Sequence, residues 1–425
     1  MTRPGLRAAA WVLSGLLLGV GSTAWKAGGE SRTLPPAPGG APLLAASETS
    51  SATVVGTVGP AVRLDVRGLA AELVVERVLA GAIRPGSHQR IAWEEISPQR
   101  ASRFPEGSKL VVALEPLPRG SLWRTRFPDG EALAVAARGN AFLREPDTAT
   151  LDALAAYLAL ESSARSESRG VSALLGLAAD GHLSLAAAAL SKLDAVPELD
   201  ARLTDVDRDH YSRLLSDPER PLALRLQALE LAGRRALQSL RSSIAPWARP
   251  GSPLEAPALA AIAQIDGGLS KSAVEALLLR PEAAIREIAV RFAREGIGEA
   301  RLEALMQKDP APEVRAAALQ TLIERRGSAA LDAALPLLFD PDPLVTRTAS
   351  VGIASLGSEV VPKLRRLLEQ RPFDEARELA PVAFAMAMAG PEGRSALGEI
   401  AASHPDARVR RLAGLALGRF SGDPH

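Results

Sequence analysis

The chain has 425 residues, and its 50 Lys and Arg against 49 Asp and Glu give a formal net charge of +1. A nearly neutral chain has no global field that would steer it to nucleic acid or a membrane surface, so no nucleic-acid partner is expected. Cysteine is absent, which excludes disulfides, thiolate catalysis and cysteine zinc sites, and aromatic residues at 4% favour thin layers of Ala and Leu over one thick core.

The N-terminus carries the features of an export signal. Arg3 and Arg7 precede an uncharged apolar run, and small residues up to Ala24 follow it, where a signal peptidase would cleave. The alternative is an uncleaved membrane anchor, because residues 8–25 carry no charge and are long enough to span a bilayer. Both alternatives predict an extracytoplasmic location, periplasmic or secreted, with inner-membrane attachment in the second case.

Residues 26–51 predict a tether between this signal and a folded domain. Proline and glycine dominate the segment, and its apolar residues follow neither a helical nor a strand period. Such a tether would hold the folded part away from a membrane, or would follow a cleavage site.

Short runs rich in β-branched residues come next and are separated by turn residues. The runs are 53–58, 62–66, 72–79, 90–93, 109–114, 123–127 and 133–135. They predict a small all-β barrel or sandwich of six or seven strands. Trp93 and Trp123 are either core side chains or a ligand platform, and an indole at strand spacing favours the core.

Three segments of this unit, VVGTV, VERVLAGAIRPG and FPEGSKLVVALE, resemble OB-type, inhibitor-like barrels found at the front of exported bacterial proteins. Barrels of the inhibitor type begin with a cysteine that reaches a metal, and this chain has no cysteine. The resemblance therefore implies a barrel and does not imply metalloprotease inhibition.

Beyond the β-rich runs, a segment of about thirty residues recurs from residue 220 to residue 420. The copies are marked by Arg220, Pro250, Pro281, Pro310, Pro341, Pro372 and Pro405. Eight residues after each marker stands an alanine, namely Ala228, Ala258, Ala289, Ala318, Ala349, Ala380 and Ala413. Alanine or a larger apolar residue also stands four and twelve residues after each marker. Because these offsets share one helical face, each copy should bury one stripe in a stacked helical array.

Each copy is predicted to be a helical hairpin whose first helix ends at a glycine, the residue that tolerates a left-handed helix end. These glycines are Gly233, Gly267, Gly296, Gly327, Gly357 and Gly390. Four helices upstream, at 151–161, 171–179, 183–193 and 201–215, are predicted to be divergent repeats that cap the array.

The segments from Asp309 to Leu319 and from His404 to Ala413 resemble the HEAT-like repeat of the phycobilisome-lyase type. The resemblance implies an α-solenoid. It does not imply an activity, because such repeats occur in enzymes, adaptors and scaffolds alike.

One arginine per repeat recurs five residues after the marker, at Arg225, Arg286, Arg315, Arg377 and Arg410. The fixed register favours a structural ladder, in which each guanidinium pairs with a carboxylate or a loop carbonyl of an adjoining repeat. The alternative is a row of anion-binding arginines. Glu255 and Thr346 interrupt the series.

The sequence offers no catalytic or cofactor motif. It contains no Gly-rich phosphate loop and no nucleophile elbow. It also lacks the His-Glu dipeptides that the iron-binding hydroxylase built from similar repeats uses. His210, near Asp207, is expected on a solvated helix surface rather than in a site. No enzymatic activity, cofactor or metal site is expected.

We therefore expect a multidomain protein in which a small all-β domain precedes an all-α HEAT-like solenoid. Its parts are a signal peptide or anchor (1–25), a tether (26–51), the β domain (52–145), capping helices (146–219) and the solenoid (220–420). The expected function is a scaffold or adaptor of the bacterial cell envelope that binds a protein partner through the solenoid. Candidate exposed contacts are Arg301, Glu303, Lys363, Arg365 and Arg366. The alternatives are a lyase-type enzyme or maturation factor with a pocket between β domain and solenoid, and a ligand-binding β domain.

Overall fold

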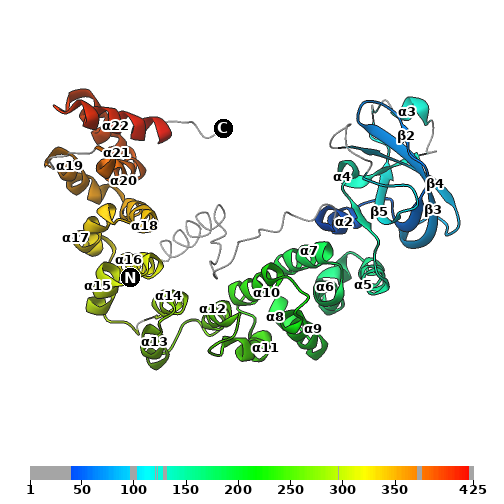
Figure 1. The fold of residues 1–425 in the computed structure, drawn as a ribbon, viewed down its shortest axis with the longest axis horizontal. Helices are drawn as coiled ribbons and strands as arrows, with labels where there is room; N and C mark the ends of the chain where they lie inside the picture. Colours follow the sequence, from blue (N-terminus) through cyan, green and yellow to red (C-terminus); the bar gives the residue numbers. More distant parts are fainter. Residues whose placement is uncertain are drawn as a thin grey trace. The chain divides into compact units, whose positions relative to one another are not determined.

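A computed structural model describes residues 40–95, 103–119, 121, 123–127, 132–294, 296–370 and 376–420. The signal peptide or anchor predicted in residues 1–25 lies outside this range. The chain divides into two compact units. We call Met1–Arg165 with Ala173–Lys192 the β unit and Ser166–Ser172 with Leu193–His425 the helical unit (Figure 1). Within the residues that the model describes, no helix is both long and apolar enough to cross a membrane.

The strands of the β unit close into a five-stranded barrel. They are β1 (Ala52–Val58), β2 (Val62–Arg63), β3 (Gly68–Gly81), β4 (His88–Glu94), β5 (Lys109–Pro116), β6 (Ala132–Val135) and β7 (Phe142–Arg144). The pairing order is β1-β3-β4-β6-β5, and β5 pairs again with β1, which leaves β2 and β7 outside the ring. Only β4 and β6 run parallel in these pairings. The predicted small all-β barrel is confirmed.

Three aromatic side chains pack together among the aliphatic residues of the barrel core. The ring of Phe104 lies 4.7 Å from that of Trp93 and 4.8 Å from that of Phe142, measured between centroids. The Trp93 indole is 1% exposed, and its Nε1 donates to Glu95 Oε1 at 2.8 Å. Trp93 is therefore a core residue whose one polar atom is satisfied inside the fold, and it offers no platform to a ligand.

Two of the strand predictions are wrong. Residues 123–126 form a short helix, α3 (Trp123–Arg126), and the Trp123 indole donates to Asp65 Oδ2 at 2.7 Å. The run predicted at 62–66 pairs only through Val62–Arg63, because the Asp65 carboxylate accepts the backbone N–H groups of Arg67 and Gly68 in a turn that ends the strand.

The predicted tether is wrong for its last part. Residues 40–47 form helix α2 (Gly40–Ser47), which packs against β5, β7 and the short helix α4 (Ala136–Gly139). Leu43 and Leu44 are both 0% exposed. The proline and glycine content around them conceals this short apolar run, whose burial depends on contacts with the barrel rather than on helix periodicity.

Ionic contacts attach two further helices to the β unit. Glu48, just after α2, accepts hydrogen bonds from Tyr157 on α5 (Thr148–Leu158) and from Lys192 Nζ on α7 (Leu183–Asp194), the latter at 2.6 Å. Burial, together with the Glu48 carboxylate, raises the pKa of Tyr157 and keeps the phenol protonated. The structure thus groups these helices with the barrel, whereas the sequence analysis grouped them with the solenoid.

Helical hairpins make up most of the helical unit. Before the first repeat the chain forms α6 (Ser168–Asp180), most of which belongs to the β unit, and then α8 (Leu199–Arg202) and α9 (Asp205–Ser216). The first helices of the repeats are α10 (Leu222–Arg234), α12 (Glu255–Ile265), α14 (Ala283–Arg291), α16 (Pro312–Arg326), α18 (Pro343–Ala354), α20 (Ala380–Met388) and α22 (Ala407–Phe420). The second helices are α11 (Arg241–Ile244) with η4 (Ala245–Ala248), α13 (Lys271–Leu278), α15 (Glu299–Lys308), α17 (Leu331–Ala334) with η6 (Leu335–Phe339), α19 (Val361–Gln370) and α21 (Pro391–Ser403). Each first helix packs against the next first helix, so the predicted all-α solenoid is confirmed.

The repeated alanines lie where neighbouring helices meet. Ala228, Ala258, Ala289, Ala318 and Ala349 are each 0% exposed, and Ala413 is 1% exposed. The sixth copy departs from the predicted register, because Ala380 is only half-buried whereas Leu379, Ala383 and Ala387 are 0% exposed. The true stripe of this copy is therefore displaced by three residues (383 − 380), and Pro372 does not mark it.

Four of the predicted helix-ending glycines adopt positive φ, namely Gly267, Gly327, Gly357 and Gly390. The prediction is wrong for Gly233 and Gly296, where the left-handed residues are Ala236 (φ 49°) and Arg294 (φ 42°) instead. Gly233 serves helix packing, because a Cβ there would lie 2.9 Å from the Cα of Ala261 on the next first helix.

Candidate functional site

Two arginines of the predicted series clamp an aspartate of the following repeat. Arg286 donates from Nε to Asp309 Oδ2 at 3.0 Å and from Nη2 to Oδ1 at 2.8 Å. Arg315 binds Asp340 through the same atoms at the same distances. These side chains are at most 12% exposed. We call such a pair a rung. It joins the residue five after one marker to the residue immediately before the next marker.

Each rung also fixes the loops on both of its sides. The remaining nitrogen of Arg286, Nη1, donates to the carbonyl of Pro281 in the loop before its own helix at 2.7 Å. On the other side, Asp309 Oδ1 accepts from the backbone N–H of Ala311 at 2.9 Å. Because both charged groups also bind backbone, the rung holds two consecutive first helices at a defined spacing.

The environment keeps the rungs ionised. Burial by itself would raise the pKa of Asp309 and of Asp340, but the hydrogen bonds from Arg286 or Arg315 and from a backbone N–H outweigh it and lower both values. The same pairing raises the pKa of Arg286 and Arg315. Neither pair is poised to exchange a proton near neutral pH, which is the behaviour of a structural ion pair rather than of an acid–base catalyst.

Glu255 does not interrupt the ladder, contrary to the sequence interpretation, but forms a rung of reversed polarity. Its Oε1 accepts from Arg280 Nη1 at 2.9 Å, and its Oε2 accepts from the backbone N–H of Gly251 at 2.9 Å. Glu255 stands five residues after Pro250, and Arg280 stands immediately before Pro281. The sequence does predict this rung, but only when the residue five after one marker is compared together with the residue before the next marker. Comparing the first of these positions alone across the repeats shows a glutamate in a series of arginines.

The other members of the series do not form such a rung within the described part of the chain. The Thr346 hydroxyl donates to the carbonyl of Pro343 at 3.1 Å, within the first turn of its own helix. Arg410 donates to the carbonyls of the loop before its own helix, at residues 404 and 405. The Arg225 Nε is buried and has no hydrogen-bond partner among the described residues. The side chain of Arg377 lies outside the described set.

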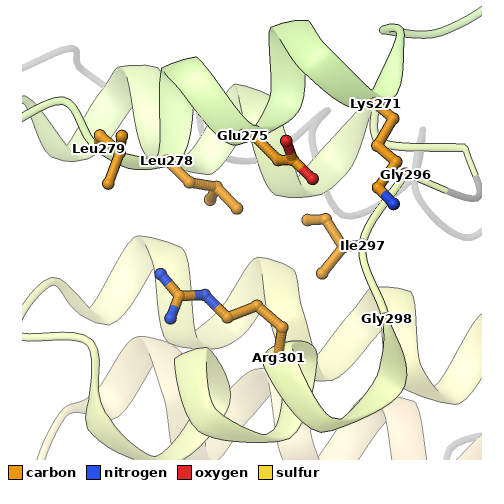
Figure 2. Close-up of a pocket in the computed structure, with 8 residues that line it drawn as sticks. All are labelled: Lys271, Glu275, Leu278, Leu279, Gly296, Ile297, Gly298 and Arg301. Atoms are coloured by element: carbon orange, nitrogen blue, oxygen red, sulfur yellow. The ribbon is translucent and has the colours of Figure 1, made fainter.

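A groove of about 380 Å³ lies between the second helices α13 and α15 (Figure 2). Leu278 and Ile297 are buried in its floor, and Leu279 at its rim is 82% exposed. The loop before α15 passes close to the start of α13 at Gly296, where a Cβ would lie 3.2 Å from the Cα of Lys271.

Three charged side chains surround this apolar floor. Lys271 and Glu275 come from α13, and Arg301 extends from α15 on the opposite side (Figure 2). No side-chain hydrogen bond or ion pair joins any of them to another residue in the part of the chain that the model describes. The sequence analysis named Arg301 but not Lys271 or Glu275. The groove depends on the distance between α13 and α15, which the sequence pattern does not predict.

The comparisons with known proteins bear on this helical region. Residues 299–387 match the family model of HEAT repeats. Among solved structures, human deoxyhypusine hydroxylase in complex with glycerol is 17% identical, with 61% of this chain and 98% of that chain covered and a TM-score of 0.28. An engineered protein is 16% identical, with 59% and 96% covered and a TM-score of 0.18. No curated protein matches the sequence.

Most of the other predicted exposed contacts of the HEAT-like array are engaged in surface ion pairs. Glu303 binds Arg326 at 2.8 Å, and Arg365 binds Glu399 at 2.7 Å. Lys363 binds Asp332 at 2.5 Å. Arg366 is exposed. Such exposed pairs contribute little to stability.

The surface around His210 is less solvated than expected, because His210 is half-buried although Asp209 beside it is exposed. Asp207 is 0% exposed, and its Oδ2 accepts from the backbone N–H and the hydroxyl of Thr204, both at 2.7 Å, which caps α9. The His210 Nδ1 is also buried. Within the described ranges, no group of three or more His, Asp or Glu side chains is placed to hold a metal ion.

Proposed function

We propose that this protein is an exported interaction scaffold of the bacterial cell envelope and that it binds a protein partner through its HEAT-like solenoid. The match of residues 299–387 to HEAT repeats supports protein binding in general, because stacked hairpins present an extended surface and repeat their contacts along it. The main observation behind the proposal is the groove between α13 and α15, which we take as the surface that binds the partner.

The groove has the composition of a peptide-binding surface. An exposed leucine beside a buried apolar floor is a ready anchor for one apolar side chain of a partner. Lys271 and Arg301 add two positive charges and Glu275 one negative charge around it. We therefore infer that the partner segment offers an apolar side chain next to an acidic one.

Export rests on Arg3, Arg7 and the apolar run that follows them. Alkaline phosphatase fused after residue 51 is expected to be active in a bacterial host and to lose activity when residues 1–25 are deleted. N-terminal sequencing of the exported fusion then distinguishes cleavage after Ala24 from an uncleaved anchor. An inactive fusion that accumulates as an intact polypeptide would contradict export.

Crosslinking tests the groove in the native envelope. A photo-reactive amino acid at position 279 of the full-length protein is expected to trap one polypeptide. Arg301→Glu should lower the yield by about tenfold, the effect of losing roughly 1.4 kcal/mol at an interface anchor. The yield should depend on Arg301 because that side chain lies across the groove from α13.

Position 415 supplies the matched control, because Leu415 is 64% exposed on α22 and lies outside the groove. The same reagent at residue 415 should not trap that polypeptide. Equal yields from residues 279 and 415, or an unchanged yield with Arg301→Glu, would show that the groove is not the binding surface.

A further inference from the structure

The interface between the first two copies of the array has a rung position with two like charges. Arg225 stands five residues after Arg220, and Arg249 stands immediately before Pro250. At the three closed rungs these two positions hold opposite charges, as Glu255 with Arg280, Arg286 with Asp309 and Arg315 with Asp340. The register thus directs two guanidinium groups to a place where each of the three closed rungs has one guanidinium and one carboxylate.

The contacts of the two arginines are those of anion-binding groups rather than of paired side chains. The Arg225 Nε is buried and lacks a hydrogen-bond partner among the described residues, which is costly for a charged donor. Arg249 is exposed, and the described residues supply neither a hydrogen bond nor an ion pair to its side chain. In the closed rungs, by contrast, Arg286 and Arg315 each bind their aspartate through Nε.

We propose that a phosphate-type oxyanion, either inorganic phosphate or a phosphate monoester, occupies the rung position between Arg225 and Arg249. A single carboxylate has two oxygens and satisfies one guanidinium, as Asp309 does for Arg286. A phosphate group carries more oxygens and up to two negative charges, which suits two guanidinium groups. Because Arg249 is exposed, an anion could reach the site from solvent. The buried Nε of Arg225 would then donate to it from the inner side.

The test titrates the full-length protein with sodium phosphate, against sodium chloride at the same ionic strength, and measures binding calorimetrically and by the melting temperature. We expect a saturable response to phosphate. Arg225→Gln and Arg249→Gln should each weaken phosphate binding at least tenfold, and Arg366→Gln, a change of another exposed arginine, should leave it unchanged. Equal phosphate binding by all four proteins would overturn the proposal.

A second variant separates this site from nonspecific stabilisation by salt. Arg249→Asp should close the rung as Asp309 and Asp340 do, raise the melting temperature in chloride, and remove the response to phosphate. A phosphate response that survives in Arg249→Asp would overturn the proposal, as would stronger binding of acetate than of phosphate. Titration with phenyl phosphate distinguishes the two sources, since binding equal to that of inorganic phosphate assigns a site open to monoesters and loss of binding assigns the free ion.

Discussion

Replacing Asp309 by Arg is expected to destabilise the protein by about 3–5 kcal/mol, the effect of breaking a buried ion pair. The change places a second positive charge against Arg286, whose side chain is 11% exposed, and it also removes the acceptor for the Ala311 backbone N–H. Chemical denaturation followed by the helical circular dichroism signal measures the difference.

The reversed rung supplies the rescue for this experiment. The double variant Arg286→Glu/Asp309→Arg reproduces the charge order of Glu255 and Arg280, so it should recover most of the loss and leave about 1 kcal/mol from the missing cap. Asp332→Arg is the control, because Asp332 is 80% exposed in its pair with Lys363 and such pairs contribute about 0–1 kcal/mol. The losses of stability of the single variants Arg286→Glu and Asp309→Arg are added for comparison. If the double variant loses as much stability as this sum, the contact is not ionic.

The rungs also determine how stability depends on pH. The pKa of Asp309 in the folded protein lies below its ordinary value of 3.8, so its stabilising effect is fully present above that value. The effect is lost as the pH falls through the lowered pKa, because the protonated acid no longer pairs with Arg286. The stability difference between the parent protein and Asp309→Asn should therefore be constant near neutral pH and should shrink in acid.

Ala383→Leu is expected to destabilise the protein by about 1–3 kcal/mol, because Ala383 is 0% exposed and the larger side chain overpacks the contact between hairpins. Ala380→Leu should have a smaller effect, since Ala380 is only half-buried on the same helix. For a unit of this size, each 1 kcal/mol corresponds to roughly 2–4 °C in melting temperature.

The comparison of these two alanines decides the register of the sixth copy. A larger loss of stability for Ala380→Leu than for Ala383→Leu would restore the register that the sequence predicts from Pro372. Ala318→Leu extends the test to a copy in which sequence and structure agree, and it should behave as Ala383→Leu does, because Ala318 is 0% exposed.

The sequence was sufficient to predict the array, because the requirement for a small residue at each helix contact recurs as Ala228, Ala258 and their equivalents. It was insufficient for the sixth copy, where a proline at the expected spacing imitates the marker and the buried stripe begins three residues later (383 − 380). The sequence also concealed the rung of Glu255. Exchanging the two charges of a pair preserves the ion pair, but it changes the residue type at both repeat positions, so the copies no longer match there.

The candidate groove could not be predicted in the same way. It depends on the separation of α13 and α15 and on the glycines of the connecting loop, neither of which leaves a periodic signal. Helix α2 has a similar origin, because Leu43 and Leu44 are buried by the barrel and not by any feature of their own segment. A periodic sequence pattern predicts contacts that recur in every repeat. The groove and the burial of α2 instead depend on individual tertiary contacts that occur once within a unit.

The polarity of the rungs makes the hairpins unequal as modules. Removing residues 309–339 would bring Arg286 opposite Asp340, and the junction would remain electrically matched. Removing residues 280–308 would instead bring Glu255 opposite Asp309, two carboxylates in one buried position. The array therefore tolerates shortening by gene deletion at one junction and resists it at another, so charge order restricts how such a chain can lose or duplicate units.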